Sequence, residues 1–173
     1  YGSDINQKAV YDTNTNIDWL FENFRQLDKS VFNIDIFLSD VRLIAQNIPQ
    51  NSIDAIITEP YLGPPLFKRL SSEAIDNTLL EVGRLYLSAF SELRKILQTG
   101  GKVIIVFPAF EDWGKMYFVE ILSKIKGMGF FQTEMIPPEI ADNSFIKLTN
   151  RGTILYGDNE QFMKREILSF QKK

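Results

Sequence analysis

The apolar positions of this chain fall into two kinds of segment, short β-branched runs and longer stretches in which apolar residues recur every three to four positions. The short runs predict strands, which are rich in Val, Ile and aromatic residues. They lie at residues 34–38, 53–58, 103–107 and 130–136, and residues 1–4 resemble the end of another strand. The periodic stretches predict amphipathic helices over about 6–27, from Ser71 or Ser72 to about residue 97, and from a cap at Asp112 to Gly127 and Gly129.

The alternation of strand and helix changes near the carboxyl end of the chain. Residues 153–156 and 165–170 are strand-like, and the segment between them is too short for a crossover helix. They therefore predict an antiparallel hairpin. Together the elements predict an α/β fold, a three-layer sandwich formed as one domain over residues 1–173.

Local signals also predict where elements end and how they lie in the sheet. Gly100-Gly101 should stop the long helix, and Pro108 should end the strand at 103–107. That strand is the most hydrophobic run, so we expect it near the middle of the sheet. The segment 55–57 is apolar on both faces, as in a parallel strand covered by helices on both sides. Ligands of such sheets bind at the carboxyl ends of the strands.

Composition removes several classes of function. A chain of 173 residues suits one sizeable core, and its net charge of −3 argues against a dedicated nucleic-acid surface, so such a substrate would need help from another domain or subunit. The chain has no cysteine and no histidine, which excludes disulfides, cysteine nucleophiles, His-based triads and ordinary zinc sites, and we expect no metal. No apolar run approaches the roughly 20 residues of a membrane span, and no segment resembles a signal peptide, so we expect a cytoplasmic protein without membrane contact.

Acidic residues follow three successive predicted strands. Asp4 and Asp40 each end a strand, and Glu59-Pro60-Tyr61 follows the third. In parallel strands these carboxylates would fall on one edge of the sheet, where one could accept hydrogen bonds from ribose hydroxyls and another from an adenine amine. Taken alone, a strand-end Asp is more often a helix cap or turn former than a ligand-binding residue.

Four segments of this chain resemble consecutive motifs of class I S-adenosylmethionine-dependent methyltransferases. They are residues 1–10, the Ser-Asp-Val-Arg of 39–42, the Asp-Ala-Ile-Ile-Thr-Glu-Pro-Tyr-Leu-Gly of 54–63, and residues 93–106 with their Gly-Gly turn. The likeness is greatest to the amino-methylating branch with an Asp/Asn-Pro-Pro-Tyr loop, especially the RNA guanine-N2 methyltransferases whose catalytic domain follows a THUMP RNA-binding domain. It implies a Rossmann-like sheet with a carboxyl-terminal antiparallel hairpin.

The resemblance implies a role for each candidate site residue. Asp4 with Ile5 would hold the ribose of S-adenosylmethionine, and Asp40 with Val41 would contact its adenine. Glu59, Pro60 and Tyr61 would meet the target amine, and Leu62 with Gly63 would contact the substrate. A base amine is a poor nucleophile because its lone pair is delocalised, and a carboxylate with a backbone carbonyl accepting its hydrogens favours the attacking geometry.

The family's glycine-rich motif is missing from this chain. It would precede Tyr1, so the resemblance implies a domain that lacks its first strand, with any upstream RNA-binding domain absent as well. The expected function is N-methylation of a base amine of RNA, with guanine N2 in tRNA as the expected substrate. DNA amino-methylation is the alternative enzyme, and a non-catalytic methyltransferase-like subunit or fragment that binds a partner is the alternative from another class. Residues 64–69 predict a substrate-facing lid or a solvated loop, and Lys164-Arg165 a solvated charge pair.

Overall fold

The computed structural model describes residues 1–24, 26–66, 68–137, 139, 146, 148–158 and 161–173. Its amino-terminal part holds a small parallel sheet of β1 (Gly2–Asp4) and β2 (Ile36–Leu38), with helix α1 (Gln7–Asn23) between them in sequence. The 3₁₀ helices η1 (Lys29–Val31) and η2 (Val41–Gln46) flank β2. The side chain of Asn6 caps α1 by accepting from the N–H of Lys8.

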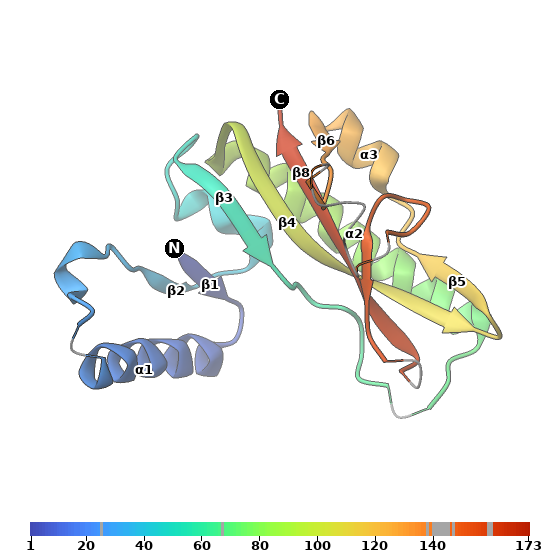
Figure 1. The fold of residues 1–173 in the computed structure, drawn as a ribbon, viewed down its shortest axis with the longest axis horizontal. Helices are drawn as coiled ribbons and strands as arrows, with labels where there is room; N and C mark the ends of the chain where they lie inside the picture. The colour runs from blue at the N-terminus through green and yellow to red at the C-terminus, as the bar shows by residue number, and fades with distance from the viewer. Residues whose placement is uncertain (25, 67, 138, 140–145, 147, 159–160) are drawn as a thin grey trace.

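A six-stranded mixed sheet forms the rest of the molecule (Figure 1). Its main path runs β3-β4-β8-β6, β5 pairs with β4, and β7 pairs with β8. Among the described strands of this sheet, β3 pairs with β4 in parallel and the other pairings are antiparallel. The bounds are β3 (Ile53–Thr58), β4 (Leu97–Asp112), β5 (Lys115–Phe118), β6 (Phe130–Gln132), β7 (Ile154–Tyr156) and β8 (Met163–Lys172).

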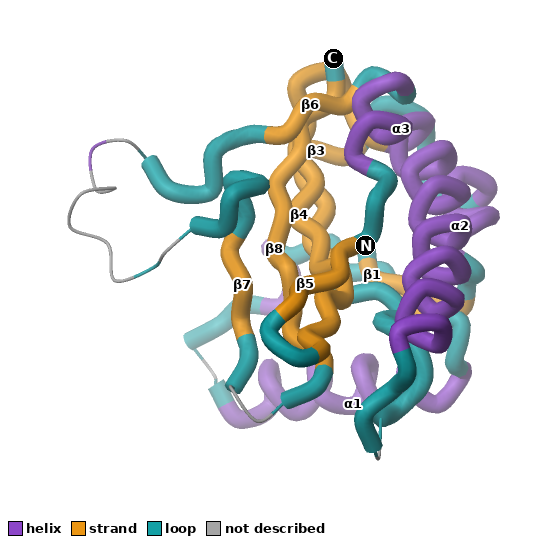
Figure 2. Tube along the Cα trace, turned by 90° about the vertical axis from the view of Figure 1, so that its right-hand side faces the viewer, coloured by secondary structure: helices purple, strands orange, loops and turns teal. Residues whose placement is uncertain are grey.

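Helices α2 (Ser72–Ile96) and α3 (Leu122–Gly127) lie on the same face of this sheet (Figure 2). The side chain of Ser71 caps α2, as predicted. Phe90 of α2 is fully buried and meets the rings of Phe130 and Phe170 edge-on, with centroids 5.1 and 5.3 Å away. Such aromatic contacts make the α2–sheet interface the centre of the core.

These observations confirm the predicted α/β fold, the central position of β4 and the antiparallel pairing of β7 with β8. The bounds predicted for β3 agree with the structure. The predicted single sheet is, however, divided into two. Among the described residues β1 and β2 pair only with each other, and neither pairs with β3. Ile57 is 78% exposed, so the expectation of a β3 covered on both faces was wrong.

The predicted end of the long helix near residue 97 agrees with the end of α2 at Ile96. Gly100-Gly101 is not what stops the helix, because both glycines lie within β4, which the chain enters at Leu97. The predicted end of the next strand at Pro108 was also wrong. Strand β4 continues through Pro108 to Asp112. A proline lacks the N–H for a ladder hydrogen bond, but its neighbour on that side is missing: β3 pairs only as far as Ile105, and β5 begins pairing at Ala109.

The helix predicted from Asp112 is instead a β-hairpin. Asp112 pairs with Lys115, and the two turn residues, Trp113 and Gly114, have φ of 50° and 77°. Positive φ at both positions is the geometry of a type I′ turn, whose twist matches that of paired strands. Pairing with the long β4 therefore overrode the helical spacing of the aromatic residues, and only the six-residue α3 remains helical.

Candidate functional site

A cleft of about 350 Å³ lies between the two sheets. Ser3 of β1, Phe37 of β2 and Ala55 of β3 line its walls, and Leu85 and Ala89 of α2 lie beneath them. Val41 and Pro60, which follow β2 and β3, also border it. The cleft thus reaches past the carboxyl ends of β2 and β3, whereas Asp4, Asp40 and Glu59 themselves are not among the residues that line it.

The cleft separates two strand edges. Among the described residues β1 pairs only with β2, and β3 only with β4, yet both β1 and β3 line the same cleft. In Figure 1 the two strands run in the same sense on either side of it. The backbone N–H and C=O groups along such edges are ready to pair with a further strand.

Asp4 lies exposed at the end of β1. Its Oδ1 accepts from the N–H of Asn6 at 2.7 Å, so the residue shapes the turn into α1. The adjoining Ile5 is 70% exposed. The turn engages Oδ1 of this carboxylate. Carboxylate oxygens are the acceptors that a ribose diol would need.

Asp40 is the N-cap of η2 and is bound by Arg42. The backbone N–H of Arg42 donates to Oδ1 at 2.8 Å, and its Nε lies 3.0 Å from both carboxylate oxygens. These hydrogen bonds lower the pKa of Asp40. A ligand amine at this carboxylate would share it with Arg42, while Val41 supplies the apolar surface of the cleft.

Glu59 follows β3 and is held by Arg165 of β8. Arg165 Nε donates to Oε2 at 3.0 Å and Nη2 donates to Oε1 at 3.2 Å, a two-point contact between residues 106 positions apart. The pair raises the pKa of Arg165. The interpretation of Lys164 and Arg165 as a merely solvated pair was therefore wrong, since Lys164 Nζ also contacts Glu111 Oε2, at 2.6 Å.

No local signal in the sequence pointed to Arg165. Its partner is set by the register of β8 on β4, which places Arg165 opposite Pro108, beyond the point where β3 ends. A strand register established over the whole sheet brings the two charges together.

A side chain of α2 holds the backbone of the loop that follows Glu59. The buried hydroxyl of Tyr86 donates to the carbonyl oxygen of Tyr61 at 2.8 Å, and its ring stacks on Phe107 with centroids 4.8 Å apart. Burial, with the charge of Glu59, raises the pKa of Tyr86. Gly63 has φ of +107°, and a Cβ there would lie 2.8 Å from Thr78 Cγ2. Only glycine fits that position.

A second cavity, of about 430 Å³, borders the same loop. It is mostly apolar and includes one charged residue, and its lining residues include Leu62, Gly63, Phe110, Phe162 and Arg165. Arg165 therefore borders this cavity and at the same time holds Glu59. The aromatic walls suit a planar ring.

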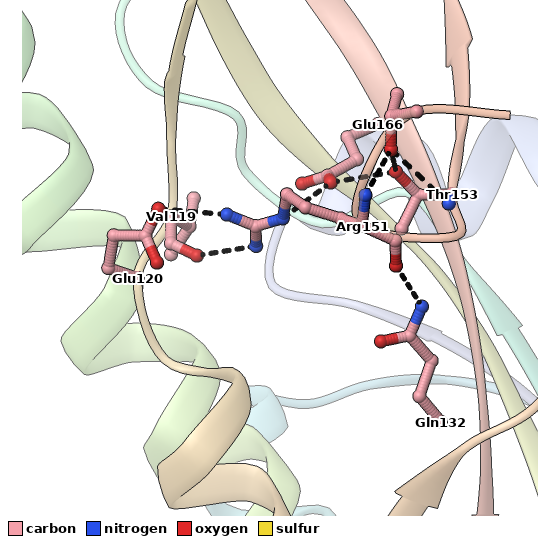
Figure 3. Close-up of polar contacts among 7 residues, drawn as sticks. Val119, Glu120, Gln132, Arg151, Thr153 and Glu166 are labelled. Carbon is pink, nitrogen blue, oxygen red and sulfur yellow. Dashed lines mark hydrogen bonds and ion pairs between the residues drawn. The ribbon is translucent and has the colours of Figure 1, made fainter.

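A buried polar cluster lies next to Arg165 in β8 (Figure 3). Glu166 is fully buried, its Oε1 lies 3.0 Å from Arg151 Nε, and Thr153 Oγ1 donates to the same oxygen at 2.9 Å. Arg151 also donates to Glu120 Oε1 at 2.9 Å and to the carbonyl oxygen of Val119 at 3.1 Å. Burial raises the pKa of Glu166, and the charge of Arg151 opposes that shift. The cluster ties residues 149–153 to β8.

No family model matches this sequence, and no curated protein matches it. Solved structures do. NSun6 from Pyrococcus horikoshii, solved with SFG, has a TM-score of 0.58 at 15% identity over 98% of this chain and 40% of its own. TrmN from Thermus thermophilus has a TM-score of 0.50 at 12% identity over 99% of this chain and 35% of its own.

This chain has the class I methyltransferase fold. It spans about a third of TrmN and two fifths of NSun6. The chain is also similar to the [4+2]-cyclase SpnF, with a TM-score of 0.55 at 16% identity over 99% of this chain and 64% of that one. A fold shared with a cyclase does not determine the reaction, so the residues of the site must carry that argument.

Two further properties concern the described part of the chain. None of its helices has the length and apolar character to cross a membrane. Its acidic side chains do not gather in groups of three or more that would hold a metal ion.

Proposed function

We propose that this chain is the catalytic core of an S-adenosylmethionine-dependent N-methyltransferase acting on an exocyclic base amine of RNA, with guanine N2 in tRNA as the favoured substrate. One observation carries the proposal: the Glu59 carboxylate is held by two hydrogen bonds from Arg165, and the loop that follows Glu59 borders both cavities. Pro60, the residue after Glu59, borders the first cavity, and Leu62, two residues further on, borders the second. The loop thus lies between a space for a cofactor and a space for a base.

The residues around the first cavity fit the nucleoside part of S-adenosylmethionine. Asp4, with Ile5, directly follows the lining residue Ser3 and provides an exposed carboxylate for the ribose diol. Asp40 directly precedes the lining residue Val41 and provides an acceptor for the adenine, for which Val41 supplies an apolar surface. When bound, the cofactor supplies a methyl group made electrophilic by its sulfonium. Its amino-acid end would need the glycine-rich motif that this chain lacks.

The loop residues prepare the amine. The carboxylate of Glu59 and the carbonyl of Pro60 accept its two hydrogens, which directs the nitrogen lone pair toward the methyl group. Glu59 then takes the proton that the methylated nitrogen loses. Tyr61, 50% exposed, offers a ring that can stack on the base, and Leu62 with Gly63 forms the wall beside it. The bond from Tyr86 keeps the carbonyls of this loop in place.

We further propose that residues 1–173 form a single domain whose sheet is completed by a strand between β1 and β3, supplied upstream of Tyr1. Support comes from the cleft, where two strand edges of the same sense face each other above the apolar residues of α2. The same open cleft favours the second candidate, a non-catalytic subunit that binds a partner there.

The test uses the chain extended upstream by the strand and its glycine-rich turn. Calorimetry should show binding of S-adenosylmethionine, and transfer of a labelled methyl group to tRNA should follow. Glu59→Ala should lower transfer by about 100-fold or more, the size of a general acid–base contribution, with cofactor affinity unchanged. Glu81→Ala, at an exposed position of α2, is the matched control and should leave both unchanged.

Three outcomes separate the candidates. A folded, extended chain that binds no cofactor would exclude the enzyme and leave the non-catalytic subunit. Undiminished transfer by Glu59→Ala would remove this residue from the mechanism. Transfer to DNA in preference to tRNA would favour the DNA amino-methyltransferase.

A further inference from the structure

The turn between β4 and β5 holds a tryptophan in an unfavourable backbone conformation. Trp113 has φ of 50° at the first central position of the type I′ turn, where Asn, Asp and Gly are usual. A bulky residue there is a backbone outlier, and such outliers gather at functional sites. The side chain of Trp113 is 87% exposed, so packing in the core does not account for it.

An arginine from another loop stacks against this indole. Arg69 Cζ lies 4.7 Å from the centroid of the Trp113 ring and 5.9 Å from that of Phe162. Asp112 Oδ1 lies 3.6 Å from Arg69 Nε and helps to hold the guanidinium between the two rings. Arg69 thereby joins the β4–β5 turn to Phe162, the residue before β8, at one end of the molecule (Figure 1).

The charge of this end is locally positive although the whole chain carries −3. Glu111 is paired with Lys164 and Asp112 with Arg69, so the nearby acids are compensated. Lys68 is exposed, and Lys115 Nζ lies 4.4 Å from the centroid of the Tyr117 ring. Neither lysine forms an ion pair within the described residues. We call the set formed by the indole of Trp113 and the three cations Lys68, Arg69 and Lys115 the aromatic rim.

The aromatic rim adjoins the second cavity. Phe162 lies in the wall of that cavity and also lies under the guanidinium of Arg69. A strand of nucleic acid with one base in the cavity would therefore have its next nucleotides within reach of the aromatic rim. This step rests on the proposed function, because it takes the second cavity as the site of the target base.

We propose that the aromatic rim binds single-stranded nucleic acid beside the target base, with one base stacked on Trp113 and adjacent phosphates on Arg69, Lys68 and Lys115. An exposed indole beside a guanidinium offers a flat surface on which any base can stack, and the lysines attract the backbone. Paired bases hide their faces in the duplex, so the surface selects single strands.

The chain has two tryptophans, which permits a direct optical test. In a Trp19→Phe variant, Trp113 is the only indole, and a single-stranded oligoribonucleotide of about 12 residues should quench its fluorescence at low salt. A duplex of the same sequence should quench it much less. In the converse variant, Trp113→Asn, the fluorescence of Trp19, on α1, should not respond.

Trp113→Asn should also weaken binding of the single strand about 10-fold in fluorescence anisotropy, within the range for loss of one stacked base. Asn favours the left-handed turn conformation, so this variant keeps the hairpin. Trp19→Phe is the control and should bind as the unmodified chain does, and Lys115→Gln should reduce the slope of log affinity against log salt by about one.

These measurements need neither cofactor nor turnover. Three results would each overturn the proposal that the aromatic rim binds single strands. They are unchanged affinity in Trp113→Asn, equal quenching by the duplex, and no binding of the single strand by the unmodified chain. Absence of methyl transfer with intact, Trp113-dependent binding would instead count against the proposed function and leave the aromatic rim standing.

Discussion

Helices α1 and α2 have similar amphipathic patterns but very different surroundings. The 25 residues of α2 include ten buried ones, whereas the 17 residues of α1 include one, Val10. The apolar residues around α1 remain exposed: Tyr11 is 68% exposed, Val31 71% and Trp19 56%. Periodicity prepares a helix to pack, but burial requires a sheet to pack against, and β1 with β2 provides only a short one. The stability of the molecule therefore resides in β3–β8 and α2.

The largest effect should come from removing a buried aromatic ring of α2, compared with removing an exposed ring near α1. Phe90→Ala removes a fully buried ring of α2 and should lower the free energy of unfolding by about 3–5 kcal/mol. Phe32→Ala removes a ring that is 50% exposed and touches Phe21, and should cost less than about 1 kcal/mol. Urea unfolding of both variants measures the difference. Equal losses would refute the location of the core.

A smaller effect should follow from the buried acid of β8. The pKa of Glu166 is raised in the native state, so the native state binds this proton more tightly than the unfolded chain does. Its stabilisation is complete below the ordinary glutamate pKa and is lost as pH rises through the raised native value. The free energy of unfolding should therefore fall, relative to Glu166→Gln, as pH rises above the ordinary glutamate pKa.

The control for that measurement is an exposed glutamate of α2, the helix that packs on the same sheet. Glu81→Gln should follow the unmodified chain across the whole pH range. If Glu166→Gln and the unmodified chain have parallel profiles, Glu166 titrates alike in both states and the cluster with Arg151 has no pH-dependent role.

The smallest effect tests the border between the two regions. Ile57 lines the cleft and is 78% exposed, so Ile57→Thr should change the free energy of unfolding of this chain by less than about 0.5 kcal/mol. In the chain extended by an upstream strand the same substitution should cost more than about 1 kcal/mol, because the added strand would cover the side chain. Equal costs in both chains would argue against a strand in the cleft.

Much of the architecture follows from the sequence alone, because its causes are local. The bounds of β3, the cap at Ser71, and the hairpin of β7 with β8 depend on side chains close to one another in the chain. The placement of acidic residues after three strands could be predicted in the same way. So could the class of fold, since it follows from the alternation of those elements.

The tertiary structure alone decided what partners these residues have. Arg165 reaches Glu59 across 106 positions because the register of β8 on β4 brings it there, and no nearby residue signals that contact. The turn at Trp113 formed because β4 offered a partner for β5, which outweighed a helical spacing. The cleft between β1 and β3 likewise depends on which strand edges find neighbours. Local patterns specify elements, whereas pairing over long distances specifies the site.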